Sequence, residues 1–343
     1  MILSGAVAAG VTIGLLRQSR SSSQDLNLGG IVPFSDESTI ISVTQRSLPA
    51  MASVLTESGG EATAMGSAFA VRGDGYLVTT TRVLANAGGL SVILGRDGKR
   101  HDARVVGFDC GSGVAVLKVD QVSGLPALSW ADSGSLKAGQ TVLAMGGPLQ
   151  PANSVSRGVI SGLHRTVLAV DTINPARNDE FDDAILTDAP VDPAGAGGPL
   201  LNTSGQVVGI LMGSRSADAS AYGLAANSVQ AVVDQVISTG QLVIASIGSG
   251  GSELAAEEAA ARGLVPGQVL RDVEPGGPAA AAGLKAGDVI TQIDDAKVDA
   301  AHPLSQLLRT RFKPNQRVAV TFSRGSSSSQ VQLTLRGEHP SCT

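Results

Sequence analysis

The chain offers few side chains that could carry acid–base or metal chemistry. Its four histidines are spread along the sequence, and we expect them to be solvated or hydrogen-bonded structural residues. No cysteine pair and no Cys/His cluster has the spacing of zinc ligands, and the acidic run at 179–183 is typical of a solvated loop. We therefore expect no metal and no cofactor. The residues considered are His101, His164, His302 and His339, with Asp179, Glu180, Asp182 and Asp183 in the acidic run.

Two cysteines, Cys110 and Cys342, are too few for a disulfide framework. Cys110 lies three residues before Gly113, but no histidine has a place in the sequence from which to activate it. We predict a partly buried and inert thiol. The two cysteines fall in different predicted domains, so we do not expect them to pair, although the sequence leaves this open.

The chain has 343 residues, and at roughly 100–200 residues per domain this length suggests two domains that position the residues above. Hydrophobic residues make up 43% and charged residues 16%, so the chain can bury substantial cores. Its 43 glycines favour a β-rich fold with many tight turns. The net charge of −5, without a basic stripe, argues against nucleic acid as a partner.

The first residues form an uncharged apolar run, Met1–Leu16, followed by Arg17 and Arg20. As a helix it would be about 24 Å long, against about 30 Å for the hydrocarbon core of a membrane. We predict a signal-like or membrane-anchor segment at 1–20 and a linker at 21–39, with cleavage and orientation left open. A buried core helix is the alternative.

Short apolar strands alternate with turns from residue 40 to residue 240. Gly73-Asp74-Gly75 and Asp97-Gly98 each separate two strand-like runs, which is a strong hairpin signal. Buried strands are predicted at Val114–Val119 and Thr141–Gly146, and helical spacing from Val229 to Ser238 predicts a closing helix. Many short strands at this spacing indicate a β-sandwich or barrel.

The composition changes after Thr239. Residues 242–337 begin with a Gly/Ser-rich stretch that enters a helix, for which Ser252 is the predicted N-cap. Strands and two further helical segments follow, the last helix at Pro303–Arg311. This pattern predicts a second, smaller α+β domain and a polar tail at 338–343.

The order of several motifs resembles that of the HtrA (high-temperature-requirement A) proteases. The similarity covers about residues 40–337. It implies a mainly β fold, with a chymotrypsin-like double six-stranded β-barrel at 40–240 followed by a smaller α+β PDZ domain at 242–337. The motifs are GSAFAVRGDGYLVTTTRVL from Gly66, FDCGSGVAVLKV from Phe108, LTDAPVDPAGAGGPLLNTSGQVVGI from Leu186 and PGGPAAAAGLKAGDVITQID from Pro275.

Proteases that resemble this chain use a Ser-His-Asp triad. The resemblance places Arg82 at the histidine position, Gly113 at the aspartate position and Ala196 at the serine position, with Ala194 and Gly195 in the oxyanion turn. Arginine is no general base near neutral pH, glycine cannot orient an imidazole, and alanine has no nucleophilic atom. We therefore expect that the chain is not an enzyme but a pseudoenzyme of the serine endopeptidase class.

PDZ domains add a peptide C-terminus as an extra strand and hold its carboxylate with backbone amides. The resemblance places the carboxylate loop directly after residue 245 and one wall of the specificity pocket on the last helix. The helix residues could equally be core. The predicted peptide-binding residues are Ser246, Ile247, Gly248 and Ser249 in the loop, and Leu304, Leu307 and Leu308 on the helix.

The resulting hypothesis is a catalytically inactive HtrA-like pseudoprotease of the cell envelope, membrane-anchored or exported. It would bind peptides or protein C-termini through its PDZ domain and have a regulatory role. One alternative is a serine endopeptidase with atypical or residual activity. The other is a regulatory subunit of an active family oligomer. The oligomers considered are a homo-trimer and a mixed oligomer with active relatives.

Overall fold

The computed structural model describes residues 36–58, 61–84, 89–147, 154–170, 178–214, 221–254, 256–299, 302–325 and 327–339. The predicted signal-like segment at 1–20, most of the linker and most of the tail lie outside these residues. The chain divides into two compact units, Met1–Thr39 and Ile40–Thr343. No helix among the described residues is long and apolar enough to cross a membrane.

Seven antiparallel strands form the first sheet, in the order β5-β4-β1-β2-β3-β7-β6. The run from Arg100 to Asp109 is divided at Ala103 into β5 and β6, which are the two end strands of the sheet and pair with β4 and β7 respectively. One continuous segment therefore joins both ends of the sheet. Because this segment counts as two strands, β5 and β6, the sheet has seven strands where a six-stranded barrel is expected. The strands are β1 (Met51–Ser58), β2 (Glu61–Ala70), β3 (Tyr76–Thr80), β4 (Gly89–Leu94), β5 (Arg100–Asp102), β6 (Arg104–Asp109) and β7 (Val114–Lys118).

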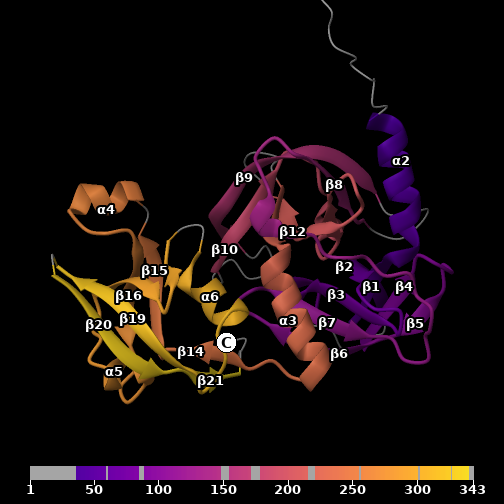
Figure 1. The fold of residues 1–343 in the computed structure, drawn as a ribbon. Helices are drawn as coiled ribbons and strands as arrows, with labels where there is room; N and C mark the ends of the chain where they lie inside the picture. The colour runs from indigo at the N-terminus through magenta and orange to yellow at the C-terminus, as the bar shows by residue number, and fades with distance from the viewer. Residues whose placement is uncertain are drawn as a thin grey trace, which may run out of the picture. The chain divides into compact units, whose positions relative to one another are not determined.

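A second sheet closes into a barrel of six strands, in the order β10-β13-β12-β11-β8-β9 (Figure 1). Closure removes free strand edges. We call the two sheets and the helix that follows them the barrel domain. Its strands are β8 (Thr141–Met145), β9 (Val155–Val170), β10 (Asn178–Thr187), β11 (Pro199–Leu201), β12 (Val207–Ser214) and β13 (Ala221–Ala225).

Helices complete the barrel domain. In α3 (Ala226–Thr239) the buried residues Val229, Val232, Val233 and Val236 recur at i, i+3, i+4 and i+7, so one face of the helix covers the core. Gly240, with φ of 74°, ends the helix and donates its N–H to Val236. The other helical segments are α2 (Asp36–Ser47) and the short 3₁₀ turns η1 (Leu48–Ala50), η2 (Thr81–Leu84), η3 (Ser133–Ser135) and η4 (Pro193–Gly195).

The C-terminal domain contains a sheet in the order β15-β16-β17-β19-β20 and a small pair, β14 with β21. The Gly/Ser-rich stretch is strand β15, not the start of a helix, so Ser252 pairs with β16 and is no N-cap. The elements are β14 (Ile244–Ser246), β15 (Ser249–Leu254), α4 (Ala256–Arg262), β16 (Gly267–Val273), α5 (Pro278–Ala281), β17 (Val289–Ile293), β18 (Ala296–Lys297), α6 (Leu304–Thr310), β19 (Arg317–Arg324), β20 (Ser327–Thr334) and β21 (Arg336–Glu338).

A buried carboxylate, Asp288, lies at the start of β17 and accepts hydrogen bonds from Arg324 Nε (2.6 Å), Arg324 Nη2 (2.7 Å) and the Lys285 N–H (2.8 Å). Burial by itself raises the pKa of Asp288. The hydrogen bonds from Arg324 and Lys285, and the attraction of their charges, outweigh burial, so the pKa lies below its ordinary value.

Because the folded state lowers this pKa, Asp288 stabilises the protein above the pKa of the unfolded chain, and that contribution is lost as pH falls through the folded pKa. We expect Arg324→Met to move the acid-unfolding midpoint, followed by circular dichroism, to higher pH. Arg317→Met, an exposed change on the same strand, is the control and should leave the midpoint unchanged. Equal midpoints in both variants would contradict the assignment.

Candidate functional site

The turn between β10 and β11 carries three of the predicted site residues. Asp192 caps the 3₁₀ turn η4, and its Oδ1 accepts the Ala194 N–H at 2.8 Å. The Gly195 N–H bonds Asp192 O at 2.7 Å, and the Ala196 N–H bonds Pro193 O at 3.3 Å. The amides expected to form the oxyanion turn are therefore all satisfied within the turn, and an oxyanion would have to displace them.

Strand β2 is hydrogen-bonded to this turn through Ser67. The Ser67 N–H donates to Ala196 O at 2.8 Å, and Ser67 Oγ donates to Ala194 O at 3.0 Å. Gly197 has φ of 85°, and a Cβ there would collide with Ser67 O, so only glycine fits. Ser67 is fully buried and supports the turn rather than offering a hydroxyl to a substrate.

Arg82 lies in η2, directly after β3. Its Nη1 donates to the hydroxyl of Tyr222 at 3.2 Å, so it contacts the second sheet of the barrel domain. The sequence did not indicate the tyrosine contact, because 140 residues separate Arg82 from Tyr222.

Gly113, the residue at the aspartate position, has φ of 69°. A Cβ there would lie 2.6 Å from Met212 Cε and 2.8 Å from Phe181 Cε1. Its carbonyl accepts the Thr81 N–H at 2.9 Å, which ties this turn to the segment that carries Arg82. Aspartate would need a different backbone conformation and a displaced aromatic ring.

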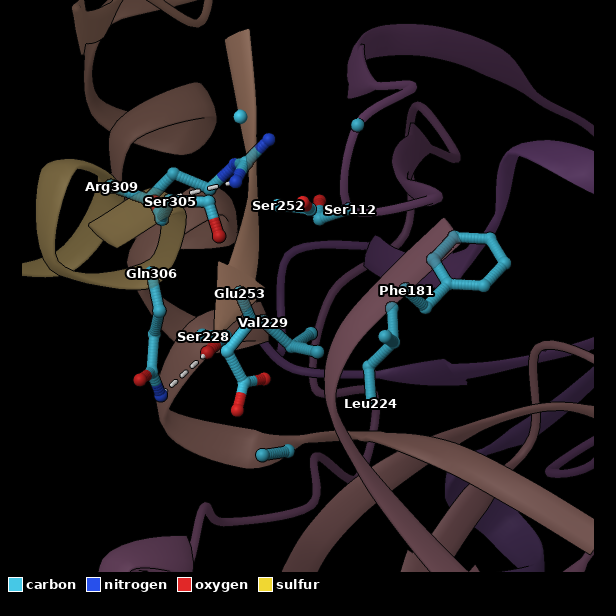
Figure 2. Close-up of a pocket in the computed structure, with 13 residues that line it drawn as sticks. Ser112, Phe181, Leu224, Ser228, Val229, Ser252, Glu253, Ser305, Gln306 and Arg309 are labelled. Atoms are coloured by element: carbon cyan, nitrogen blue, oxygen red, sulfur yellow. Dashed lines mark hydrogen bonds between the residues drawn. The ribbon is translucent and has the colours of Figure 1, made fainter. Parts of the chain in front are cut away.

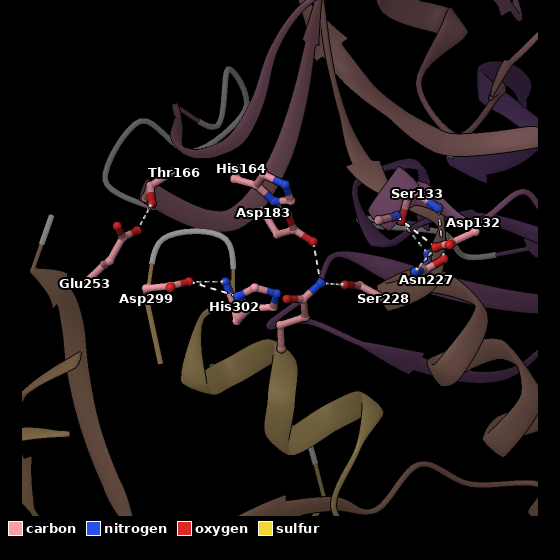
Figure 3. A network of polar contacts seen from close by, with 12 residues as sticks. Asp132, Ser133, His164, Thr166, Asp183, Asn227, Ser228, Glu253, Asp299 and His302 are labelled. Carbon is pink, nitrogen blue, oxygen red and sulfur yellow. Dashed lines mark hydrogen bonds and ion pairs between the residues drawn. The ribbon is translucent and has the colours of Figure 1, made fainter. Parts of the chain in front are cut away.

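Each histidine makes a hydrogen bond, as expected. His164 Nδ1 lies 2.7 Å from Asp183 Oδ1, and Asp183 also accepts from Gln306 Nε2 at 2.5 Å (Figure 3). The expectation of a solvated acidic loop is wrong at this point, because residues 178–187 form β10 and Asp183 is buried. The remaining contacts are His101 with Asp97, His302 with Asp299, and His339 with Leu242 O.

Cys110 is disulfide-bonded, so the expectation of an inert thiol is wrong. Cys342, the other cysteine of the sequence, lies outside the described residues. The preceding residue, Asp109, is fully buried and accepts from Arg309 Nε at 3.0 Å and from the Gly111 N–H at 3.0 Å.

The predicted carboxylate loop lies between β14 and β15. Ile247 is buried, and Gly248 has φ of 70°, a conformation that favours glycine. The Gly248 N–H donates to Ser246 Oγ at 3.0 Å. Strand β15 begins at Ser249 and is the end strand of its sheet, so no strand of the described residues pairs with the edge away from β16, which we call the open edge of β15.

Helix α6 faces this edge. Leu304, Leu307 and Leu308 are buried in the core of the C-terminal domain. The α6 side chains that line the neighbouring cavity are Ser305, Gln306 and Arg309 (Figure 2). The sequence pattern could find the buried face of the helix but not the residues beside it that reach the cavity.

Comparison with known proteins places these features in a class. The family profile of the trypsin-like peptidase domain matches residues 66–210, and that of the PDZ domain matches residues 245–335. The fold and site therefore define a trypsin-like peptidase domain joined to a PDZ domain, which confirms the predicted fold class.

Individual relatives narrow the class to a family. A "Probable periplasmic serine endoprotease DegP-like" of Halomonas elongata is 34% identical over 82% of this chain and 58% of its own length. A "Serine protease Do-like HtrA" of Lactococcus lactis is 32% identical over 77% of this chain and 67% of its own length. The solved "HtrA-type protease AlgW with tripeptide" superposes with a TM-score of 0.70 and 29% identity, over 88% of this chain and 98% of that one.

The chain belongs to the HtrA family of trypsin-fold serine proteases with a PDZ domain. It spans little more than half the length of several curated relatives, for example 58% and 53%. The comparisons overturn the expectation that the chain is not an enzyme, because the matching profile is a peptidase domain and the relatives are named as serine endoproteases.

Proposed function

We propose that this chain is an extracytoplasmic HtrA-type endopeptidase of atypical mechanism whose C-terminal domain captures the C-termini of peptides or proteins. The open edge of β15 beside the Ser246–Ser249 loop is the observation that carries the proposal. The extracytoplasmic setting is supported by relatives named as periplasmic.

Peptide capture follows from the geometry of this edge. An extended peptide that pairs with β15 gains main-chain hydrogen bonds, and its carboxylate then meets the loop amides. The Gly248 N–H is turned toward Ser246 Oγ, so the serine hydroxyl occupies one donor until a carboxylate replaces it. Serine at 246 therefore tunes the affinity for the carboxylate.

The proposal includes peptide-bond cleavage by an atypical mechanism. Arg82, Gly113 and Ala196 stand at the triad positions, so turnover would have to proceed without a serine at 196. Assembly as a homo-trimer or a mixed oligomer with other family members is a further part of the proposal and rests on the resemblance. Attachment to a membrane through residues 1–20 is another part and rests on the apolar sequence of Met1–Leu16.

Carboxylate capture is tested with Ser246→Asp. We expect fluorescein-labelled decapeptides with a free C-terminus to bind this variant at least about tenfold more weakly in fluorescence anisotropy, because two negative charges would meet at the loop. Ser246→Asn, of the same shape without the charge, is the matched control.

Peptides that end in a C-terminal amide give the second control. They should bind the parent chain weakly and should not distinguish Ser246→Asp from Ser246→Asn. If free-acid and amide peptides bind the parent chain equally, C-terminal capture at this loop is ruled out.

A further inference from the structure

A cavity of about 240 Å³ adjoins the open edge of β15 (Figure 2). One wall is the backbone of β15 at Ser252 and Glu253, and the opposite wall is α6 at Gln306 and Arg309. The barrel domain supplies the remaining side, including Ser112 from the turn between β6 and β7. A peptide strand added to β15 would therefore also meet the barrel domain.

Ser112 is the unusual residue of this cavity. Its Oγ is buried, and the structure gives it no hydrogen-bond partner among the described residues. A buried hydroxyl without a partner costs free energy, since water satisfies it in the unfolded chain. A ligand in the cavity can supply the missing hydrogen bond.

The turn that carries Ser112 is firmly anchored. Buried Asp109 joins it to Arg309 of α6, accepts the Gly111 N–H and precedes the disulfide-bonded Cys110. The Ser112 hydroxyl is thus held at one side of the cavity while α6 forms another. Such pre-organisation lowers the entropy lost when a ligand binds.

The other side chains of the cavity indicate what it would accept. Arg309 is paired with Asp109, so it is not an unpaired cation that would attract an acidic ligand residue, and Glu253 Oε2 accepts a hydrogen bond from Thr166 Oγ1 at 3.4 Å. Gln306 Nε2 donates to Asp183 Oδ2 at 2.5 Å and to Ser228 Oγ at 3.1 Å, so Ser112 Oγ is the group of this lining that the described residues leave without a hydrogen bond. Phe181 adds an apolar side chain to the lining. A neutral polar side chain can bond the Ser112 hydroxyl, whereas an acidic one would be desolvated without a counter-charge.

We propose that Ser112 of the barrel domain completes the peptide site and selects a neutral polar residue, such as asparagine or glutamine, upstream of the ligand's C-terminus. At about 3.3 Å per residue along β15, a ligand residue opposite Ser252 or Glu253 is roughly the third to fifth from the carboxylate. This inference rests on the proposed capture of C-termini by the C-terminal domain.

The test uses the whole chain and decapeptides that carry asparagine, alanine or leucine at the third, fourth or fifth position from a free C-terminus. We expect the parent chain to prefer asparagine over alanine at one of these positions by about 3- to 10-fold, which is the range for one neutral hydrogen bond. Ser112→Ala should abolish this preference and leave the affinity for the alanine peptide within about twofold. Ser123→Ala, at an exposed serine of the same domain, is the matched control and should retain the preference.

The outcomes separate the two proposals. Loss of the preference in Ser112→Ala alone supports the role of Ser112. If peptides bind through the free carboxylate but the parent chain and Ser112→Ala show the same preference, Ser112 does not read the ligand and this inference is overturned. If free-acid and amide peptides bind alike, the capture of C-termini itself fails. Thermal melting of both serine variants confirms that each remains folded.

Discussion

The double variant Arg82→His, Ala196→Ser is expected to turn over casein about 10²-fold faster than the parent chain. The pair would place a hydroxyl nucleophile and an imidazole base at the two positions that the family uses for them. Where a triad has been dismantled in serine proteases, loss of the orienting aspartate alone costs about 10⁴ and loss of the nucleophile or base about 10⁶. The ratio of these two factors, about 10², is the gain in turnover that we expect when the nucleophile and the base are restored without the aspartate.

Single variants serve as controls for this prediction. Nucleophile and base act as a unit, so Ala196→Ser or Arg82→His alone should give little of the gain. Unchanged turnover in the folded double variant would mean that positions 82 and 196 do not meet, or that the turn stays closed by its bonds to Asp192 and Pro193.

Restoring the third position is expected to harm the fold. Gly113→Asp would place a side chain at φ of 69° and push against Met212 and Phe181, so the triple variant should melt at a lower temperature than the double variant. Gly113 therefore contributes to the packing of the barrel domain, and its effect is not limited to the missing carboxylate of the triad.

Removal of the guanidinium at Arg309 is expected to lower the free energy of unfolding by about 3–5 kcal/mol. Asp109 is fully buried, and Arg309→Met would leave its carboxylate without its charged partner in a place that water does not reach. Urea unfolding followed by fluorescence of Trp130, whose ring packs against Phe69 in the barrel domain, measures the loss.

Arg311→Met is the matched control for this prediction. Arg311 pairs with Asp295 at 2.6 Å, but both side chains are exposed, so we expect almost no change in stability. Adding Asp109→Asn to Arg309→Met should recover part of the loss, since no buried charge then remains. Equal effects of Arg309→Met and Arg311→Met would contradict the buried pair.

The sequence alone determined the class of fold and the family. Alternating apolar residues around Gly-Asp-Gly and Asp-Gly turns predicted short strands, because strand period and turn chemistry are local properties. The run from Ala194 to Leu200 marked the turn before β11, where the close approach of Ser67 O requires glycine at 197. Helical spacing likewise predicted α3.

Local sequence patterns gave the wrong structure for two segments. The Gly/Ser-rich stretch at 248–252 predicted the lead-in to a helix capped at Ser252, yet Ser249–Leu254 form strand β15, because pairing with β16 satisfies the backbone, and helix α4 begins only at Ala256. The acidic run at 179–183 predicted a solvated loop, yet it is part of β10, where long-range pairing with β9 outweighs the polar composition.

Tertiary structure alone decided what each candidate residue touches. Arg82 reaches Tyr222 across 140 positions and Arg309 reaches Asp109 across 200 positions, distances at which no periodicity carries information. Contacts of this kind depend on the packing of whole elements, so the sequence could name the residues but not their partners.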